Sequence, residues 1–369
     1  MNAIKNPVRL AATAALLVAA LTANVCQAAQ PVVLDNDWAI DDWTSLLYLA
    51  HHPGVELRGV TVTGSGEAHC PGALEQLPRL MDLAGVKADV PYDCSNPAPL
   101  DGWFVFPEPW RTDSDRLSGV QLPASTRKPA GIGAVALLHR VANAGPDKII
   151  VVATGPLTNI AQWFEQYPGD ISRIDRLVIM GGAVRAKGNI IVPQFTAGHP
   201  NHVSEWNFYI DALAAQKVLR SSAPITLVPL DVTNHVRVTA EFASAFKQRV
   251  RTPSARFVDQ VFDRNDWFIA SGEYYFWDVL AAIVAPEPAI CRSEQIPLDV
   301  VVAPASAIYA KGEDPSLDAK RWDGAPRRHL DASNAGRSVA VPVTGPRHRV
   351  CLDTRADEVM AKFTDVMNR

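Results

Sequence analysis

Near its start the chain reads Val32-Val33-Leu34-Asp35-Asn36-Asp37-Trp38-Ala39-Ile40-Asp41-Asp42. A short apolar run that passes into polar residues and then into a periodic apolar segment predicts a buried strand followed by a helix. Four carboxylates within eight residues repel one another unless something neutralises them. Capping of the helix explains Asp41 or Asp42, whereas alternation places Asp35 and Asp37 on one side of the strand. We therefore favour a bound hard cation with oxygen ligands over capping alone.

The same succession of a short apolar strand and a helical segment recurs along the chain. Predicted strands cover 31–35, 55–62, 148–153, 176–180, 225–232, 296–302 and 347–352, and predicted helices include 42–50, 71–84, 131–144, 157–166 and 211–219. This pattern predicts an α/β fold, a single large domain whose mainly parallel central sheet carries helices on both faces. Two irregular stretches, 93–130 and 183–208, follow strand ends, where the site of an open α/β sheet lies.

The composition excludes several kinds of partner. Hydrophobic residues make up 48% and charged residues 20% of the 369 residues, as in an ordinary globular protein. The net charge is −4, from 35 basic and 39 acidic residues, and no basic run is present. We therefore expect no binding to nucleic acid and a small molecule as the partner. Assembly into a homo-oligomer stays open.

The first residues are typical of a secretory signal peptide. Lys5 and Arg9 precede an apolar run over 10–23 that is too short to span a bilayer comfortably, and Ala28 and Ala29 follow. We expect 1–28 to be removed and 29–369 to be exported to the periplasm or secreted, with no membrane attachment after processing. An uncleaved anchor is the alternative.

Export affects how the cysteines are interpreted. Loss of Cys26 with the signal leaves Cys70, Cys94, Cys291 and Cys351, an even number in an oxidising compartment. We favour the pairs Cys70–Cys94 and Cys291–Cys351, because each pair flanks predicted neighbouring elements. Four buried free thiols are the alternative.

Two families begin with a strand that ends in Asp-x-Asp. In the haloacid-dehalogenase-like phosphatases Asp35 would be a nucleophile, and a later lysine and an acidic pair for Mg²⁺ would be needed, for which the sequence has no convincing match. The other family is the nucleoside hydrolases, whose opening Asp-x-Asp-x-x-x-Asp-Asp this sequence matches in every carboxylate. Trp38-Ala39 stands where that family usually has Pro-Gly.

Three further stretches resemble the nucleoside hydrolases in the same order. They are 152–159 (Val-Ala-Thr-Gly-Pro-Leu-Thr-Asn), 178–183 (Val-Ile-Met-Gly-Gly-Ala) with Gly188-Asn189 and Glu205-Trp206-Asn207 after it, and 274–278 (Tyr-Tyr-Phe-Trp-Asp). Because the resemblance spans the mature chain, 29–369 is identified as a nucleoside hydrolase domain of the inosine-uridine preferring superfamily. It is most similar to the purine-specific inosine-adenosine-guanosine type.

The resemblance implies Ca²⁺-dependent hydrolysis of the N-glycosidic bond of ribonucleosides, which gives free base and ribose and serves purine salvage. The implied Ca²⁺ ligands form an all-oxygen set: Asp37, Asp42, the backbone carbonyl of Thr154, and Asp278. Asp37 would also be the catalytic base that takes a proton from the attacking water, and Asp35 would support the ligands from behind. The implied ribose contacts are Asp41, Asn189, Glu205 and Asn207, with Glu205 and Asn207 on one extended segment.

The resemblance also bears on the leaving base. Members that accept inosine and uridine alike usually carry a histidine before the last aspartate ligand, where this chain has Trp277. Purine-preferring members have tryptophan there and a second tryptophan on a loop that 106–111 resembles, so Trp110 is the expected partner. Two indoles would stack on a purine and favour its protonated form.

One position departs from the purine-preferring pattern. Gly66 stands where those relatives often carry an acidic residue. Glu67 and His69 are the possible base contacts just beyond it, although a solvated loop carboxylate is the other interpretation of Glu67. Two alternatives to the hydrolase stay open, a haloacid-dehalogenase-like phosphatase and an exported nucleoside-binding protein without catalysis.

Overall fold

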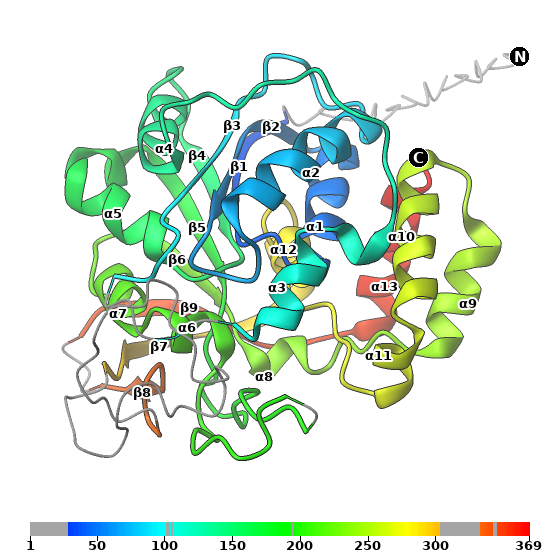
Figure 1. The fold of residues 1–369 in the computed structure, drawn as a ribbon. Coiled ribbons are helices and arrows are strands. Elements are labelled where there is room, and N and C mark those ends of the chain that lie inside the picture. Colours follow the sequence, from blue (N-terminus) through cyan, green and yellow to red (C-terminus); the bar gives the residue numbers. More distant parts are fainter. Residues whose placement is uncertain (1–28, 101–103, 105, 194, 303–332, 342–344) are drawn as a thin grey trace, which may run out of the picture.

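The computed structural model describes residues 29–100, 104, 106–193, 195–302, 333–341 and 345–369. These residues form a nine-stranded sheet in the order β3-β2-β1-β4-β5-β6-β9-β7-β8 (Figure 1). The strands are β1 (Gln30–Asn36), β2 (Val55–Thr63), β3 (Tyr92–Ser95), β4 (Ile149–Ala153), β5 (Ile174–Met180), β6 (Ile225–Val228), β7 (Cys291–Val300), β8 (Ser338–Ala340) and β9 (Arg347–Thr354). All neighbours from β3 to β9 are parallel, and β7 and β8 add an antiparallel edge. The mainly parallel sheet is thus confirmed. The predicted signal segment, 1–28, lies outside the described residues.

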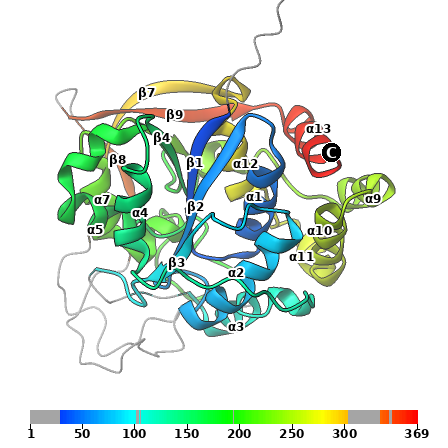
Figure 2. The ribbon, with the colours of Figure 1, turned by 90° about the horizontal axis from the view of Figure 1, so that it is seen from above.

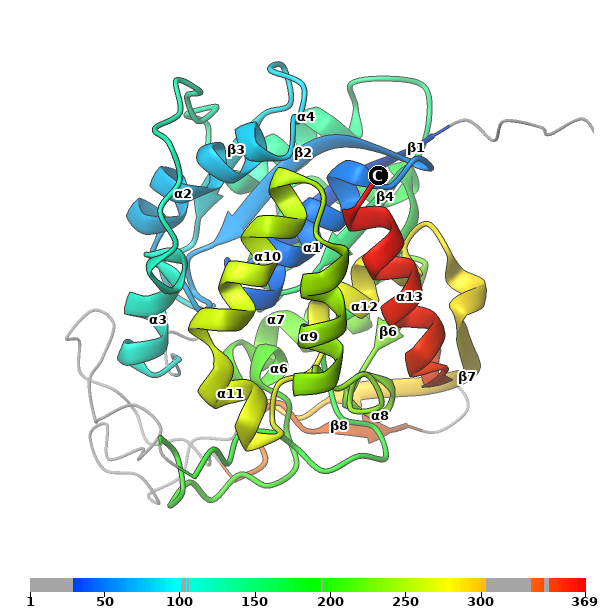
Figure 3. The ribbon, with the colours of Figure 1, turned by 90° about the vertical axis from the view of Figure 1, so that its right-hand side faces the viewer.

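Helices cover both faces of this sheet, as predicted (Figure 2). They are α1 (Ile40–His51), α2 (Cys70–Leu83), α3 (Glu108–Ser114), α4 (Ala134–Ala142), α5 (Thr158–Gln166), α6 (Trp206–Ile210), α7 (Ala212–Leu219), α8 (Leu230–Thr233), α9 (Ala240–Arg249), α10 (Pro253–Arg264), α11 (Asp266–Ser271), α12 (Trp277–Val284) and α13 (Ala356–Met367). Side chains of β1 alternate between the two layers. Val32 and Leu34 pack with α1, α2, α12 and α13, whereas Val33 packs with α4, α5 and α7. Figure 3 shows α9 and α10 beside α13, on the outer side of the helical layer that contains α1 and α12.

Some predicted boundaries were wrong. The strand predicted over 225–232 ends at Val228, because Pro229 has no N–H for the ladder and the chain turns into α8. The stretch 93–130, predicted as irregular, contains the end of β3 and all of α3, and 183–208 contains the start of α6. These elements are four to seven residues long, too short for a periodic pattern to show.

Both predicted disulfides are confirmed. Cys70 at the start of α2 is bonded to Cys94 in β3, with the Cα atoms 5.6 Å apart. Cys291 and Cys351 join the antiparallel strands β7 and β9, with a Cα separation of 5.7 Å. Among the described residues, none of the helices combines the length and the apolar character that a bilayer span requires.

Candidate functional site

A cavity of about 780 Å³ opens where the parallel strands end. Asp37 follows β1, Glu67 follows β2 and Thr154 follows β4, so three neighbouring strand ends contribute to its surface. An open α/β sheet places its ligand site at this edge. Most of the site residues expected from the sequence line this cavity: Asp37, Asp41, Glu67, Trp110, Thr154, Asn189, Glu205, Asn207, Trp277 and Asp278. Asp42 and His69 are not part of its surface.

Asp42 holds the turn between β1 and α1 together. Its Oδ2 accepts hydrogen bonds from the backbone N–H groups of Asp37 at 3.1 Å and Ala39 at 2.9 Å. Its Oδ1 accepts a hydrogen bond from Thr154 Oγ1 at 2.6 Å, although Thr154 lies 112 residues further along the chain. Asp42, the third residue of α1, therefore accepts from the N–H of the N-cap residue Ala39 and also connects the end of β4 to the end of β1.

Two glycines let the chain close around Asp37. A Cβ on Gly66 would lie 2.1 Å from the Asp37 Cβ, and a Cβ on Gly155 would lie 2.6 Å from it. The backbone N–H of Glu67 donates to Asp37 Oδ2 at 3.0 Å. An acidic side chain at position 66, common in purine-preferring relatives according to the resemblance, thus has no room here.

Asp37, Asp41, Asp42 and Asp278, together called the floor aspartates, are almost fully buried. Burial raises the pKa of Asp37 to about 6, although a hydrogen bond with the Asp42 carboxyl lowers it, and burial takes the pKa of Asp42 well above its usual value. In the same way burial raises the pKa of Asp41 and Asp278, whose carboxyls share a hydrogen bond. The backbone N–H of Asp278 also donates to Asp41 Oδ2 at 3.2 Å. The floor thus consists of two carboxyl pairs.

Asp35 lies behind this floor. Its Oδ1 accepts hydrogen bonds from Thr61 Oγ1 at 2.6 Å and Asn159 Nδ2 at 2.8 Å, and its side chain is not on the cavity surface. Burial raises its pKa to about 7 despite these two hydrogen bonds. This location matches a supporting role for Asp35 and leaves it no access to a substrate.

The turn that carries the floor departs from the family's usual Pro-Gly. Trp38 has a φ of +67°, a left-handed conformation that the ring of a proline does not allow. Its N–H donates to Asn36 Oδ1 at 2.9 Å, and its fully buried indole packs at 6.5 Å, centroid to centroid, against that of Trp43. A tryptophan therefore fills the core beneath the floor at this position.

Three of the expected ribose contacts, Asn189, Glu205 and Asn207, come together on one wall, whereas Asp41 belongs to the floor. Glu205 is the N-cap of α6, where its carboxylate accepts from the N–H groups of Gly182, Asn207 and Phe208, so the segment is helical and not extended as predicted. Burial raises the pKa of Glu205 to about 7 against these hydrogen bonds. Asn207 Nδ2 donates to the Thr154 carbonyl at 3.2 Å. Asn189 Oδ1 accepts from the backbone N–H of Trp206 at 3.1 Å.

The two tryptophans expected to hold a base belong to separate aromatic groups around the cavity. The Trp110 ring lies 5.4 Å from that of Trp206 and 5.1 Å from that of Phe195, edge to face in both cases. The Trp277 ring lies 5.6 Å from Tyr275 and 6.1 Å from Phe268. Among the described residues no ring of one group stacks on a ring of the other, and both Trp110 and Trp277 line the cavity.

Glu67 and His69 differ in their access to the cavity. Glu67 lines it, accepts from Ser114 Oγ at 3.1 Å, and has a pKa that burial raises well above the usual value. His69 instead faces away, with Nδ1 2.8 Å from Asp115 Oδ2. Of the two possible base contacts, the structure brings only Glu67 to the site.

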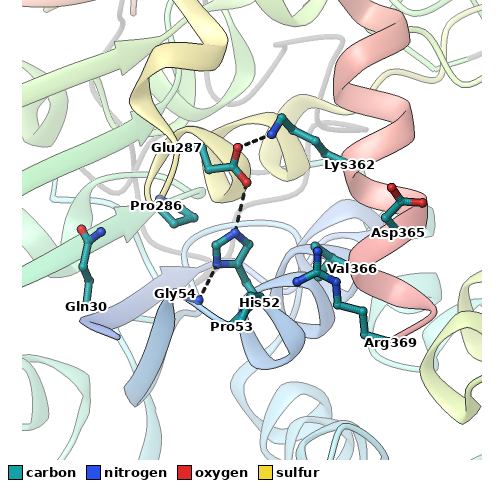
Figure 4. A pocket seen from close by; sticks show the side chains of 10 residues that line it. All are labelled: Gln30, His52, Pro53, Gly54, Pro286, Glu287, Lys362, Asp365, Val366 and Arg369. Carbon is teal, nitrogen blue, oxygen red and sulfur yellow. Dashed lines mark hydrogen bonds and ion pairs between the residues drawn. The ribbon is translucent and has the colours of Figure 1, made fainter. Parts of the chain in front are cut away.

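A second cavity, of about 450 Å³, lies at the opposite end of the sheet, beside Gln30 at the start of β1 and Gly54 just before β2 (Figure 4). Glu287 there accepts hydrogen bonds from His52, which follows α1, and from Lys362 of α13. This cavity contains none of the floor aspartates. The pairs of Glu287 with His52 and Lys362 connect the ends of α1 and α12 with α13.

Comparison with known proteins identifies the chain. The model of the inosine-uridine preferring nucleoside hydrolase family matches residues 32–347. The chain belongs to this family. Nucleoside hydrolases are N-glycosidases, so the chain is a hydrolase that acts on nucleosides, and the phosphatase alternative has no support.

Individual nucleoside hydrolases differ in the base that their names specify. The chain is 27% identical over 234 residues to the pyrimidine-specific ribonucleoside hydrolase RihA of Photobacterium profundum. The aligned region makes up 63% of this chain and 71% of that protein. An uncharacterized protein of Schizosaccharomyces pombe is 32% identical over 216 residues, 57% of this chain and 64% of that one.

Solved structures of nucleoside hydrolases share the fold. The inosine-uridine preferring enzyme from Bacillus anthracis superposes with a TM-score of 0.70 at 23% identity, over 92% of this chain and 99% of that one. A purine-preferring ribonucleoside hydrolase from Gardnerella vaginalis gives 0.68 at 22% identity over the same shares. The single α/β domain of this nucleoside hydrolase is thereby confirmed.

The packing of Gly66 and Gly155 against Asp37 and the contacts of Arg111 were not predicted from the sequence. These roles depend on contacts with segments that are distant along the chain: Gly66 and Gly155 pack against Asp37, and Arg111 donates to the Gly64 carbonyl. A basic residue next to Trp110 was the only available signal for Arg111.

Proposed function

We propose that this nucleoside hydrolase is Ca²⁺-dependent and prefers purine ribonucleosides such as inosine, adenosine and guanosine. The observation that carries the proposal is the cavity itself, which combines a floor of buried carboxylates with indoles from Trp110 and Trp277. A carboxylate floor suits a cation and a hydroxyl-rich sugar, and aromatic walls suit a base.

The floor fits Ca²⁺ by its donor set and its charge. Among the described residues, no group of three or more His, Cys, Asp or Glu side chains is placed so that it could hold a metal ion as it stands. The floor aspartates instead lie as two buried carboxyl pairs, and burial raises the pKa of all four. A divalent cation would offset their negative charge. Oxygens of Asp37, Asp42, Asp278 and the Thr154 carbonyl would hold it, and they are ligands of the kind that Ca²⁺ prefers. When bound, it would polarise water and ribose hydroxyls.

Side chains of the cavity supply the base, the ribose contacts and a contact to the leaving group. Asp37 lies on the cavity surface and takes a proton from the attacking water. Asp41, Asn189, Glu205 and Asn207 hold ribose hydroxyls, and a site built to bind a hydroxyl strongly rejects analogues that lack it. Glu67 lies on the cavity surface beside Asp37, within reach of a bound base.

Stacking accounts for the purine preference. A purine offers a larger face to the indoles of Trp110 and Trp277 than a pyrimidine does, and base stacking on an aromatic side chain contributes about 1–3 kcal/mol. The electron-rich indole faces also favour a purine that has gained a proton, which makes it a better leaving group.

The test is a kinetic panel of ribonucleosides with release of ribose as the readout. Inosine, adenosine and guanosine should exceed uridine and cytidine in kcat/KM by at least about 10-fold, or roughly 1.4 kcal/mol. Trp110→Ala and Trp277→Ala should lower purine turnover and change uridine turnover little. Asp37→Asn should nearly abolish turnover on every base and weaken Ca²⁺ binding without unfolding the protein.

Tyr167→Ala is the matched control, because this ring stacks on His139 away from the cavity. Similar kcat/KM for uridine and inosine would refute the purine preference. Equal losses on all bases in both tryptophan variants would show that the indoles only hold the loops. Binding of inosine without ribose release in excess Ca²⁺ would indicate the non-catalytic alternative.

We also propose that the mature protein begins near residue 29 and is exported to the periplasm or secreted. Two disulfides among the described residues support an oxidising compartment.

A further inference from the structure

Arg111 is a buried cation beside the site. It lies on α3 directly after Trp110, and only 4% of its surface is exposed. Its Nη2 donates to two backbone carbonyls, Gly64 O at 2.9 Å and Ala68 O at 3.2 Å. Its Nε is buried and has no hydrogen-bond partner among the described residues. The guanidinium thus binds two backbone carbonyls of one short segment, residues 64–68, called here the 64–68 turn.

The 64–68 turn holds Asp37 from three directions. The N–H of Ala68 donates to the Asp37 carbonyl at 3.0 Å, and the N–H of Glu67 donates to Asp37 Oδ2 at 3.0 Å. Gly66 packs so closely on the Asp37 side chain that a Cβ would overlap it. Any shift of the 64–68 turn therefore moves the carboxylate that the proposed reaction uses as its base.

Arg111 is also connected to Trp110 and Glu67, two residues expected to contact the base. Trp110 and Arg111 are neighbours on α3, and Ser114, one turn later, donates to Glu67 Oε1 at 3.1 Å. Because α3 has only seven residues, it relies on such contacts for its place. The indole on one side of α3 and the 64–68 turn on the other are thus joined through Arg111.

Taking these contacts together, we propose that Arg111 is a positioning residue, which sets the place of Asp37 relative to Trp110. The inference rests on the proposed roles of those two residues. Arg111 acts through the Gly64 and Ala68 carbonyls and does not line the cavity.

Electrostatics explains why a charged side chain is tolerated at this position. Burial of a cation without a partner is costly. Burial lowers the pKa of Arg111, but the negative charges of Glu108, Asp115, Asp37 and Glu67 oppose that effect. These four acidic side chains therefore offset the cost of burying the guanidinium. An apolar side chain at this position would carry no such cost, but it could not donate to the two carbonyls.

The experiment measures kcat, KM and the melting temperature with inosine for the wild type, Arg111→Met and Arg111→Lys. Displacement of a catalytic group by about 1 Å can cost about 100-fold in rate, so we expect a fall in kcat of that order for Arg111→Met. Arg111→Lys keeps a donor for the carbonyls and should recover part of the loss. Purine and pyrimidine substrates should lose kcat alike, since Asp37 serves both.

Arg173→Met is the matched control. The Arg173 guanidinium also donates to backbone carbonyls, Ala142 O at 3.1 Å and Asp147 O at 3.0 Å, but none of these residues lines the cavity. It should lower the melting temperature and leave kcat unchanged. A double-mutant cycle of Trp110→Ala with Arg111→Met should show non-additive losses in kcat/KM.

Five outcomes are decisive. Wild-type kcat in Arg111→Met, or losses that simply add in the cycle, would overturn the inference. If Arg111→Met does not fold, Arg111→Lys decides: a fall in kcat at an unchanged melting temperature supports the inference, and a lower melting temperature with wild-type kcat overturns it. Failure of the wild type to release ribose from any nucleoside would instead refute the proposed function.

Discussion

At the scale of single residues, the absence of a side chain matters as much as its presence. Gly66 and Gly155 lie against Asp37 from two different strand ends, and neither can gain a Cβ without moving it. The close approach lets backbone N–H groups reach the carboxylate, so the position of Asp37 depends on how tightly three chain segments pack.

We expect Gly66→Ala to reduce kcat by about 10- to 100-fold, because the new methyl group would push Asp37 out of place. Overpacking of this kind also destabilises, by about 1–3 kcal/mol. Ribose release from inosine and a thermal melt measure the two effects.

Gly169→Ala serves as the control for this substitution, since a Cβ there meets nothing within 4 Å. Its kcat should equal that of the wild type. Wild-type kcat in Gly66→Ala would show that Asp37 does not need the place that the structure assigns to it.

At the scale of elements, hydrogen bonds at the far end of the sheet connect α1 and α12, which contribute residues to the site, with α13. Glu287, just after α12, accepts from His52 at 3.1 Å and from Lys362 of α13 (Figure 4). Burial alone would raise the pKa of Glu287, but the hydrogen bonds from Lys362 and His52 lower it below its usual value of 4.5. The contribution to stability is therefore present above pH 4.5 and is lost as the pH falls through the lower pKa of the folded protein.

Glu287→Gln should lower the free energy of unfolding near neutral pH by about 1 kcal/mol or less, because the pair is partly exposed. The difference from the wild type should shrink as the pH is taken below about 4. Inosine kinetics should not change, since this cavity is remote from the floor aspartates. Thermal melts over a pH series provide the measurement.

Glu294→Gln is the comparison, because its partner Arg185 is exposed and such pairs contribute little. A pH-independent difference for Glu287→Gln would contradict the assigned role of this carboxylate.

At the scale of the whole molecule, the floor aspartates join segments from opposite ends of the chain. Asp278 at the start of α12 meets Asp41, 237 residues earlier, and Thr154 meets Asp42. A cation bound there would link β1, β4, α1 and α12 in the folded state and would have no such site in the unfolded chain.

Ca²⁺ should therefore raise the melting temperature in a saturable way, and a chelator should reverse the rise. The gain is about 2.7 kcal/mol when free Ca²⁺ is 100 times its Kd. Asp42→Asn should remove most of the effect. Potassium chloride at the same ionic strength controls for charge screening. If Ca²⁺ does not change the melting temperature and inosine is still hydrolysed, the metal proposal is refuted.

The sequence by itself determined the features that depend on neighbouring residues. Short continuous apolar runs with helical segments between them predicted the parallel sheet and its two helical layers, and the polar residues after 34 and 153 marked the ends of β1 and β4. Cys291 and Cys351 were paired correctly because they flank neighbouring predicted elements. The strand and helix signals are local, because they depend on the order of apolar and polar residues within one short segment.

Tertiary structure alone decided which distant groups meet. The strand order, the contact of Gly66 with Asp37 and the two carbonyls that Arg111 binds follow from how the strand ends assemble. The helical start at Glu205 arises likewise, because its carboxylate finds three N–H donors, one of them at Gly182. These contacts depend on packing between segments that are far apart along the chain, and no local pattern of residues encodes the distance between them.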